Sequence, residues 1–238
     1  MKLVLPKQHG AWAMLIIPFW LGVAAGGFTW EHIPLFLGWV LLYLATYPAL
    51  LLFKKRKIKQ YTKWTFIYAV PGVLFLLIPF LARPSIAYFG LAMIPFFIIN
   101  MYFSSKKKDR AFLNDLSAIF IFSMAGLATS YLSTGEIHSS ATLLFIASIL
   151  FFIGSTLFVK TMIREKKNIR YQYISWTYHT VVPIVWAVFG YWMVALAFLP
   201  SLFRAVYFYG KGMKMSKLGM LEVVNALFFF IVIIIAIY

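Results

Sequence analysis

The sequence contains no cysteine and very little acid. Six Asp and Glu residues occur among 238 residues, and charged residues of both signs make up 12% of the chain. Without cysteine the chain can form neither a disulfide nor a thiolate metal site nor a cysteine nucleophile. Soluble domains are about 25% charged and about 45–50% apolar, whereas this chain is 63% apolar. So few charges cannot mask the apolar surface that a water-soluble fold would expose, and the composition predicts an integral membrane protein.

The sequence also lacks the motifs of several enzyme classes. It has no HExxH, no glycine-rich phosphate loop, no GxSxG and no serine, histidine and acid in triad order. None of the few acids is spaced to share a metal, which argues against a divalent-cation site. We therefore expect neither a metal nor a bound cofactor.

Apolar runs occupy most of the chain. A membrane span needs about 20 predominantly apolar residues to cross roughly 30 Å of hydrocarbon. Nine such segments can be placed, approximately at 10–30, 33–53, 64–82, 85–103, 111–132, 139–162, 171–189, 191–209 and 219–238. Gly22 and Gly26, four residues apart in the first segment, predict a close approach by another helix. The sequence therefore predicts an all-α, polytopic membrane helix bundle, with residues 1–238 forming one membrane-embedded domain.

The basic residues are clustered around alternate connections. Lys and Arg number 22 and give a formal net charge of +16. Of these, 21 lie at the N-terminus or around the connections after the second, fourth, sixth and eighth spans, and Arg83 alone lies on the opposite side. Basic loops mark the cytoplasmic side of a membrane protein, so we expect the N-terminus inside and the C-terminus outside. Because the charge follows the spans in this way, it does not indicate nucleic-acid binding.

Polar residues within the spans are candidates for a functional site. A charge near mid-bilayer costs at least ~2.5–3.5 kcal/mol, so few are expected there without a role. Eight such residues fall near the inner ends or in the inner halves of spans: His9, Asn114, Asp115, Lys160, Arg164, Glu165, His179 and Arg204. If the spans form one bundle, these groups can converge on a polar pocket that opens to the cytoplasmic leaflet. Glu222 and Asn225, which open the ninth span, share this depth and belong to the same converging set.

Each candidate also has a structural interpretation. The long basic side chains can extend their charges to the lipid headgroups. Asp115 and Glu222, early in helices that enter from the cytoplasm, can serve a helix dipole or an ion pair. His179 fits a hydrogen-bonded histidine of the bundle interior better than a catalytic base. His9 and Asp115 are the stronger candidates, because each lies beside another polar residue and has no long stem.

Three stretches resemble a known family. They are Lys7-Gln8-His9-Gly10-Ala11-Trp12-Ala13, running into Pro18 and Gly22; Arg110-Ala111-Phe112-Leu113-Asn114-Asp115-Leu116; and Lys160-xxx-Arg164-Glu165. Through these stretches the whole chain resembles the YwiC-like family of bacterial membrane proteins. The resemblance implies a multi-pass protein of the bacterial cytoplasmic (inner) membrane and implies no particular activity.

A more distant resemblance is to the UbiA-type intramembrane prenyltransferases, which have nine spans, an inside N-terminus and an active-site cavity at the cytoplasmic side. Their loops after the second and sixth spans carry aspartate-rich motifs, NDxxDxxxD and DxxxD, which hold magnesium and an isoprenyl diphosphate. Here the corresponding loops are basic: no acid occurs between Glu31 and Asp109, and Glu165 alone occurs between Glu136 and Glu222. The resemblance therefore implies a UbiA-like bundle without magnesium-dependent prenyl transfer.

Replacing carboxylates by Lys and Arg turns a metal-bridged anion site into one that binds an anion directly, because arginine takes phosphate oxygens without a metal. The leading hypothesis is a pocket for an anionic or isoprenoid lipid, with Arg164 and Lys160 as headgroup contacts and Asp115 or His9 as the polar partner. An enzyme of this kind would be a lipid- or prenyl-group transferase, and whether transfer follows binding is left open.

Two alternatives belong to other classes. A small-solute or anion transporter would need a polar track through the membrane, and the outer halves of the spans offer few polar residues. A non-catalytic membrane subunit would use the same polar residues to hold its helices together.

Overall fold

The computed structural model describes residues 4–6, 9–54 and 57–238, and these residues form nine α-helices and one turn of 3-10 helix. The α-helices are α1 (His9–Gly26), α2 (His32–Leu52), α3 (Ile58–Ala82), α4 (Ala87–Ser105), α5 (Phe112–Thr134), α6 (Ser139–Ile163), α7 (Ile169–Val188), α8 (Trp192–Tyr207) and α9 (Met215–Ile237). The 3-10 turn, η1 (Pro84–Ile86), precedes α4. No strand occurs in the described residues, so the all-α prediction is confirmed for them.

Six helical segments are long and apolar enough to cross a membrane, by length and composition alone. They are His32–Leu52, Ile58–Ala82, Pro84–Ser105, Phe112–Thr134, Ser139–Ile163 and Met215–Ile237. Two further apolar helices, Gly10–Gly26 and Trp192–Tyr207, are shorter. α7 is not among the six segments; it has 20 residues, so its composition and not its length excludes it. The chain is therefore a helical protein with several helices able to span a membrane.

Most helices begin and end within two residues of the predicted segments. The largest differences are at the starts of α3 and α9 and at the end of α1. α3 begins at Ile58, six residues before its predicted start, and α9 begins at Met215, four residues before. Hydropathy locates only the part of a helix that lies in hydrocarbon, whereas these added turns carry lysines suited to the headgroup layer. α1 ends early, at Gly26, because Gly27 takes a left-handed backbone conformation with φ of 86°.

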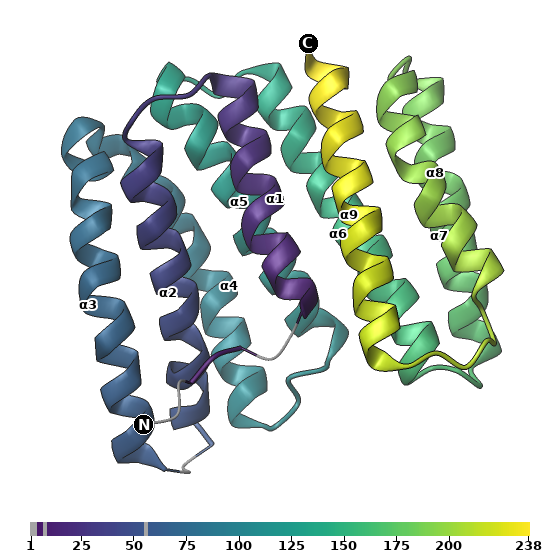
Figure 1. Ribbon diagram of the computed structural model, residues 1–238, viewed down its shortest axis with the longest axis horizontal. Coiled ribbons are helices and arrows are strands. Elements are labelled where there is room, and N and C mark those ends of the chain that lie inside the picture. The colour runs from purple at the N-terminus through teal and green to yellow at the C-terminus, as the bar shows by residue number, and fades with distance from the viewer. Residues whose placement is uncertain (1–3, 7–8, 55–56) are drawn as a thin grey trace.

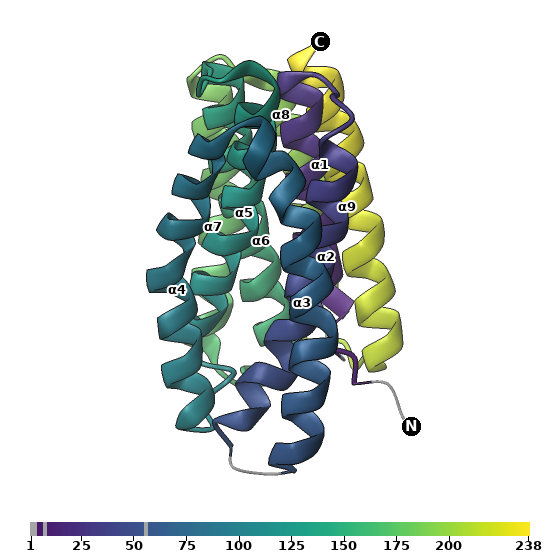
Figure 2. The same cartoon turned by 90° about the vertical axis from the view of Figure 1, so that its left-hand side faces the viewer.

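The helices are arranged as a flattened ring in chain order. From α1 to α9 each helix packs against the next, α3 and α4 being joined through η1, and α9 returns to α1. α1, α2, α3 and α9 form one layer, and α4, α5, α6 and α7 form the other (Figures 1 and 2). Across the ring, α1 packs against α5 and α6. The interior of the ring is therefore filled by helix-to-helix contact.

Burial differs between the two ends of the flattened ring. Half of the residues in the apolar windows of α5 and α6 are buried, 50% in each, against 17% in α2 and in α3 and 11% in the η1–α4 segment. The main hydrophobic core is built from α1 and α5 to α9, with Leu21, Phe151 and Phe229 among its members. α3 and α4 expose many apolar side chains, as helices in contact with lipid do, whereas most residues of α2 are partly buried.

Glycines allow α1 and α5 to touch through their backbones. A Cβ atom added at Gly22 would meet the carbonyl oxygen of Gly126 and the Oγ1 atom of Thr129. A Cβ atom added at Gly26 would lie 2.6 Å from the carbonyl oxygen of Ser130. The close approach predicted from Gly22 and Gly26 is confirmed, and α5 is the helix that approaches.

Two hydrogen bonds fasten the same junction. The hydroxyl of Thr129 donates to the carbonyl oxygen of Phe19 at 3.0 Å, which ties α5 to α1. His32, which is fully buried at the start of α2, donates from Nε2 to the carbonyl oxygen of Thr129 at 2.9 Å. The backbone amide of Thr29 donates to Nδ1 of the same ring at 2.9 Å, which fixes this tautomer. The α1–α2 connection is thereby held against α5.

We predict that Gly22→Ala lowers the free energy of unfolding by about 1–3 kcal/mol, because the new methyl group overpacks the α1–α5 contact. Gly90→Ala is the matched control: Gly90 is an exposed helical glycine in α4, and a Cβ atom there would meet nothing within 4 Å. Unfolding of the purified protein by SDS in mixed micelles measures both. Equal effects of the two substitutions would contradict the close α1–α5 contact.

Candidate functional site

A cluster of polar groups joins α5 and α6 at the end of the bundle that carries the basic loops. The Nζ atom of Lys160 lies 2.9 Å from Oδ2 of Asp115 and donates to the carbonyl oxygen of Arg110 at 2.8 Å. The amide nitrogen of Asn114 donates to the carbonyl oxygen of Asp109 at 2.9 Å. The Lys160 and Asp115 side chains retain 12% and 28% of their exposure, so the pair lies at the edge of the protein. We call these five residues the basic-end cluster.

The basic-end cluster also reaches α2. Lys54 donates from Nζ to Oδ2 of Asp109 at 2.7 Å, which links the end of α2 to the α4–α5 connection. Both carboxylates of the cluster are therefore engaged by lysines. The ion-pair interpretation of Asp115 is confirmed, and its partner is Lys160. The cluster acts as a clamp between α2, α5 and α6, and Lys54 and Lys160 each pair with one of its carboxylates.

Arg164 and Glu165 lie on the short connection from α6 to α7. Glu165 accepts a hydrogen bond from the amide of Asn168 at 2.8 Å, and Asn168 caps α7 by accepting from the backbone of Tyr171. Glu165 therefore serves the helix cap. Arg164 ends α6, is exposed, and forms no ion pair within the part of the chain that the structure describes.

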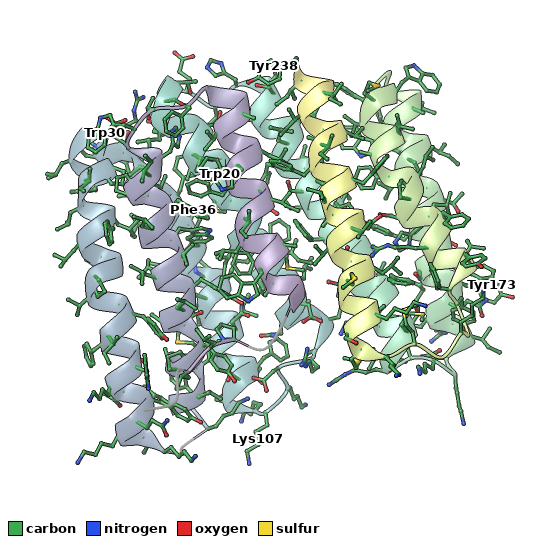
Figure 3. The ribbon with its side chains drawn as sticks, in the orientation of Figure 1. Trp20, Trp30, Phe36, Lys107, Tyr173 and Tyr238 are labelled. Atoms are coloured by element: carbon green, nitrogen blue, oxygen red, sulfur yellow. The ribbon has the colours of Figure 1, made fainter. Side chains whose placement is uncertain are left out.

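The outer face of α7 carries a groove of about 840 Å³. Its lining consists of Ile169, Arg170, Tyr173, Ile174, Thr177, Tyr178, Val181 and Val182. Arg170, at the basic end, is its one charged residue. At the inner edge, the hydroxyl of Tyr178 donates to the carbonyl oxygen of Leu150 at 2.8 Å. Tyr173 projects from α7 away from the bundle (Figure 3). The groove is apolar along its length and positive at its mouth.

A second groove, of about 520 Å³, lies between α4 and α5. Phe96, Tyr102, Leu113 and Phe120 are among its lining residues, and none of the lining residues is charged. It differs from the α7 groove in this respect, because Arg170 lines the α7 groove.

A second set of predicted residues lies deeper, between α6, α7, α8 and α9. Arg204 of α8 is 2% exposed and forms an ion pair with Glu222 of α9. Its Nη2 atom donates to the hydroxyl of Ser155 on α6 at 3.0 Å, and its guanidinium carbon lies 4.6 Å from the centre of the Phe158 ring. The ion-pair interpretation of Glu222 is thus confirmed. A buried guanidinium is tolerated because carboxylate, hydroxyl and ring all face it.

Other polar side chains extend this layer. Ser201 and Asn225, both buried, hydrogen-bond to each other at 3.0 Å between the Asn225 amide nitrogen and the Ser201 hydroxyl. His179, 3% exposed, has Nδ1 at 2.7 Å from the carbonyl oxygen of Ser175. A carbonyl only accepts, so Nδ1 carries the proton and Nε2 keeps a lone pair. Within the described residues Nε2 has no hydrogen-bond partner. We call Arg204, Glu222, Ser155, Ser201, Asn225 and His179 the buried polar layer.

Apolar side chains close the buried polar layer on both sides. One turn farther from the basic end, Phe151, Phe198 and Phe229 form an aromatic cluster, with the rings of Phe151 and Phe229 stacked at 4.1 Å between centroids. Towards the basic end, a smaller cluster comprises Phe158, Met162, Ala205 and Leu218. The layer is therefore enclosed, and its cover is thinner on the basic side.

The structure divides the predicted site residues into two groups. Asn114, Asp115 and Lys160 meet in the basic-end cluster, with Arg164 and Glu165 on the neighbouring connection. Arg204 and His179 belong to the buried polar layer. His9 begins α1, and its side chain lies outside the described residues.

Ser155 and Ser201 belong to the buried polar layer although the sequence singled out neither of them. Glu222 and Asn225 were among the polar residues expected at a shared depth, but they were not named as ligand-binding residues. A signal for Glu222 was present: it is the only acid in the last apolar segment, and the adjacent apolar segment contains a single arginine. A buried charge needs a partner, which pairs these two residues. The two serines carry no comparable signal, because serine is common on helix faces that pack together.

Comparison with known proteins places the chain among bacterial relatives of the same length. The profile of a family described as YwiC-like protein matches residues 5–130. The "Uncharacterized protein YwiC" of Bacillus subtilis (strain 168) is 46% identical over 229 residues, which are 96% of each chain. An "Uncharacterized protein" of Haemophilus influenzae (strain ATCC 51907 / DSM 11121 / KW20 / Rd) is 39% identical over 236 residues, or 99% of each chain. No solved structure matches.

Proposed function

The chain belongs to the YwiC-like family, and from its geometry we propose that it is a multi-pass membrane protein that binds an anionic or isoprenoid lipid from the cytoplasmic leaflet. The observation that carries this proposal is the α7 groove, which is apolar along α7 and ends at Arg170. A lipid has the same polarity, with an apolar chain and a charged head.

The proposal includes the topology. All nine helices cross the bacterial cytoplasmic membrane, with the N-terminus inside and the C-terminus outside. In support, α1 begins and α9 ends at opposite ends of the bundle (Figure 1). Lys107 lies at the end of the basic loops, while Trp30 and Tyr238 lie at the other end (Figure 3). Positive residues inside and aromatic residues at an interface are the usual pattern.

We predict the accessibility of single cysteines from this topology, since the chain has no cysteine of its own. Ile137, in the α5–α6 connection, and Lys107, in the α4–α5 connection, are both exposed. A membrane-impermeant maleimide added to intact cells should label Ile137→Cys, and should label Lys107→Cys only after the membrane is permeabilised. The opposite labelling pattern would contradict the topology.

The dimensions of the α7 groove suit one leaflet. It runs from Ile169, the first residue of α7, to Val182. At 1.5 Å per residue this distance is about 20 Å, against about 15 Å for half of a roughly 30 Å hydrocarbon core. A lipid chain in the groove would therefore extend from the headgroup layer to the middle of the bilayer, with its head beside Arg170.

The charge around the mouth of the groove favours an anionic head. Arg164, Lys166, Lys167 and Arg170 lie within seven consecutive positions, and the one acid among them, Glu165, is held by Asn168. Arginine binds phosphate oxygens bidentately. Because Lys160 is engaged by Asp115, we assign the headgroup contacts to Arg170 and Arg164. Nine helices in the described chain support the UbiA-like bundle expected from the sequence, and no transfer step is assigned here.

We predict that Arg170→Gln reduces lipid retention. A charge-assisted hydrogen bond contributes about 1.5–3 kcal/mol, so the lipid-bound fraction should fall by about tenfold or more under limiting lipid. Native mass spectrometry of protein purified in mild detergent measures the bound lipid, and Arg164→Ala should also lower it. Arg110→Gln is the matched control, since Arg110 is an exposed arginine at the same end that lines neither groove. Equal loss in the control would indicate general charge attraction instead of this site.

Filling the groove gives an independent test of the same proposal. Thr177→Trp places a large ring in the α7 groove, and Leu113→Trp places one in the α4–α5 groove. Only the first should displace the lipid. Retention that is unchanged in Thr177→Trp would exclude the α7 groove as the site.

Transport of a solute or anion is a second candidate function, favoured by the buried polar layer. A charged pair enclosed within a membrane bundle commonly marks a path for ions or protons. The layer lies on four helices and is covered on both sides, as an occluded site would be.

A further inference from the structure

We propose that the buried polar layer is a proton-dependent binding site for a small planar oxyanion, of the carboxylate type, with Arg204 as the anion contact. Glu222 occupies this contact in the structure. Protonation of Glu222 would release Arg204 to bind an anion that enters from the basic side. The site is separate from the α7 groove and its proposed lipid.

The contacts of Arg204 define what it can bind. Its guanidinium faces a carboxylate, a hydroxyl and an aromatic ring, contributed by Glu222, Ser155 and Phe158. The Nε–H group has no hydrogen-bond partner among the described residues. A planar oxyanion in place of the Glu222 carboxylate would keep the guanidinium–carboxylate geometry, and a second oxygen could accept from Nε–H. The Glu222 carboxylate, which already contacts Arg204, is a planar oxyanion of the kind that we propose as ligand.

Charge balance couples this binding to a proton. Arginine stays charged in proteins, so the layer is neutral while Glu222 is ionised. An anion added to that state would leave one uncompensated charge in a low-dielectric interior, which is strongly unfavourable. If Glu222 takes one proton from solvent, its carboxyl group becomes neutral, and the incoming anion restores neutrality opposite Arg204. One proton and one anion therefore bind together.

Few other charged groups among the described residues lie near Glu222 and Arg204. Facing Glu222 of α9, α8 contributes Arg204, α6 contributes the uncharged Ser155, and residues 10–26 of α1 contain no charged side chain. α7 contributes His179, whose buried ring lies against Gly154 of α6, the residue before Ser155.

Access is easiest from the basic side. The Glu222 side chain retains 11% of its exposure and Arg204 retains 2%, so the carboxylate is the more exposed member of the pair. Four buried residues, Phe158, Met162, Ala205 and Leu218, cover the layer on this side. Lys211 and Lys214 lie in or next to the nearby α8–α9 connection and raise the local concentration of anions. Separation of α8 from α9 at this end would open the site.

Nitrate is a suitable probe, because it is planar, carries one negative charge and does not titrate. The thermal-unfolding midpoint of the purified full chain in detergent is measured in nitrate and in chloride of equal concentration, at about pH 6 and about pH 8. For the wild type, nitrate should raise the midpoint by about 3–6 °C at the lower pH, the shift expected for roughly a tenfold ligand effect. At the higher pH the shift should be clearly smaller.

Two variants and a control separate the proposal from a general salt effect. Glu222→Gln mimics the protonated carboxyl group, so nitrate should stabilise it equally at both pH values. Arg204→Met combined with Glu222→Met removes both charges, a replacement that buried ion pairs often tolerate, and nitrate should then have no specific effect. Glu136→Gln, an exposed acid at the opposite end, should behave like the wild type. A nitrate shift that persists in the double variant, or that is absent in Glu222→Gln, would overturn the proposal.

Discussion

The backbone contact between α1 and α5 is the constraint on which the rest of the bundle depends. Gly22 and Gly26 let α1 lie directly on α5, so the two layers of the flattened ring touch at their middle. α2 and α3 lie at one end of the flattened ring and α7 and α8 at the other (Figure 1). A face of α7 is left towards lipid, and α6 to α9 enclose a compartment of their own. Both proposed sites follow from that arrangement.

The depth of the charged residues in the bundle follows the cost of burying a charge. At the basic end, where water and headgroups screen charges, Lys160 and Asp115 form a partly exposed pair that fastens helices together. Arg164 and Arg170 remain exposed there and can meet an anionic head. Deeper in the bundle, Arg204 is retained only with Glu222 opposite it. The same chemistry of cation and carboxylate therefore gives a clamp at the surface and an enclosed site inside.

Sequence reasoning located the helices because apolar runs and basic loops are both imposed by the membrane. It also identified the Gly22 and Gly26 contact, although the partner helix could not be read from a single sequence. It placed His179 and Arg204 beside Asp115, because depth along a helix is readable from the chain and the position around the ring is not. The α7 groove was not predictable for the same reason: it depends on which face of α7 the neighbouring helices leave open.

The central claim, that the α7 groove binds an anionic lipid, is tested most directly by a cryo-electron microscopy map of the protein in nanodiscs containing anionic lipid. The account predicts elongated density along α7 between Arg170 and Val182, with its head against the Arg170 guanidinium, and no comparable ordered density in the α4–α5 groove. An empty α7 groove, or equally ordered lipid in both grooves, would contradict the claim.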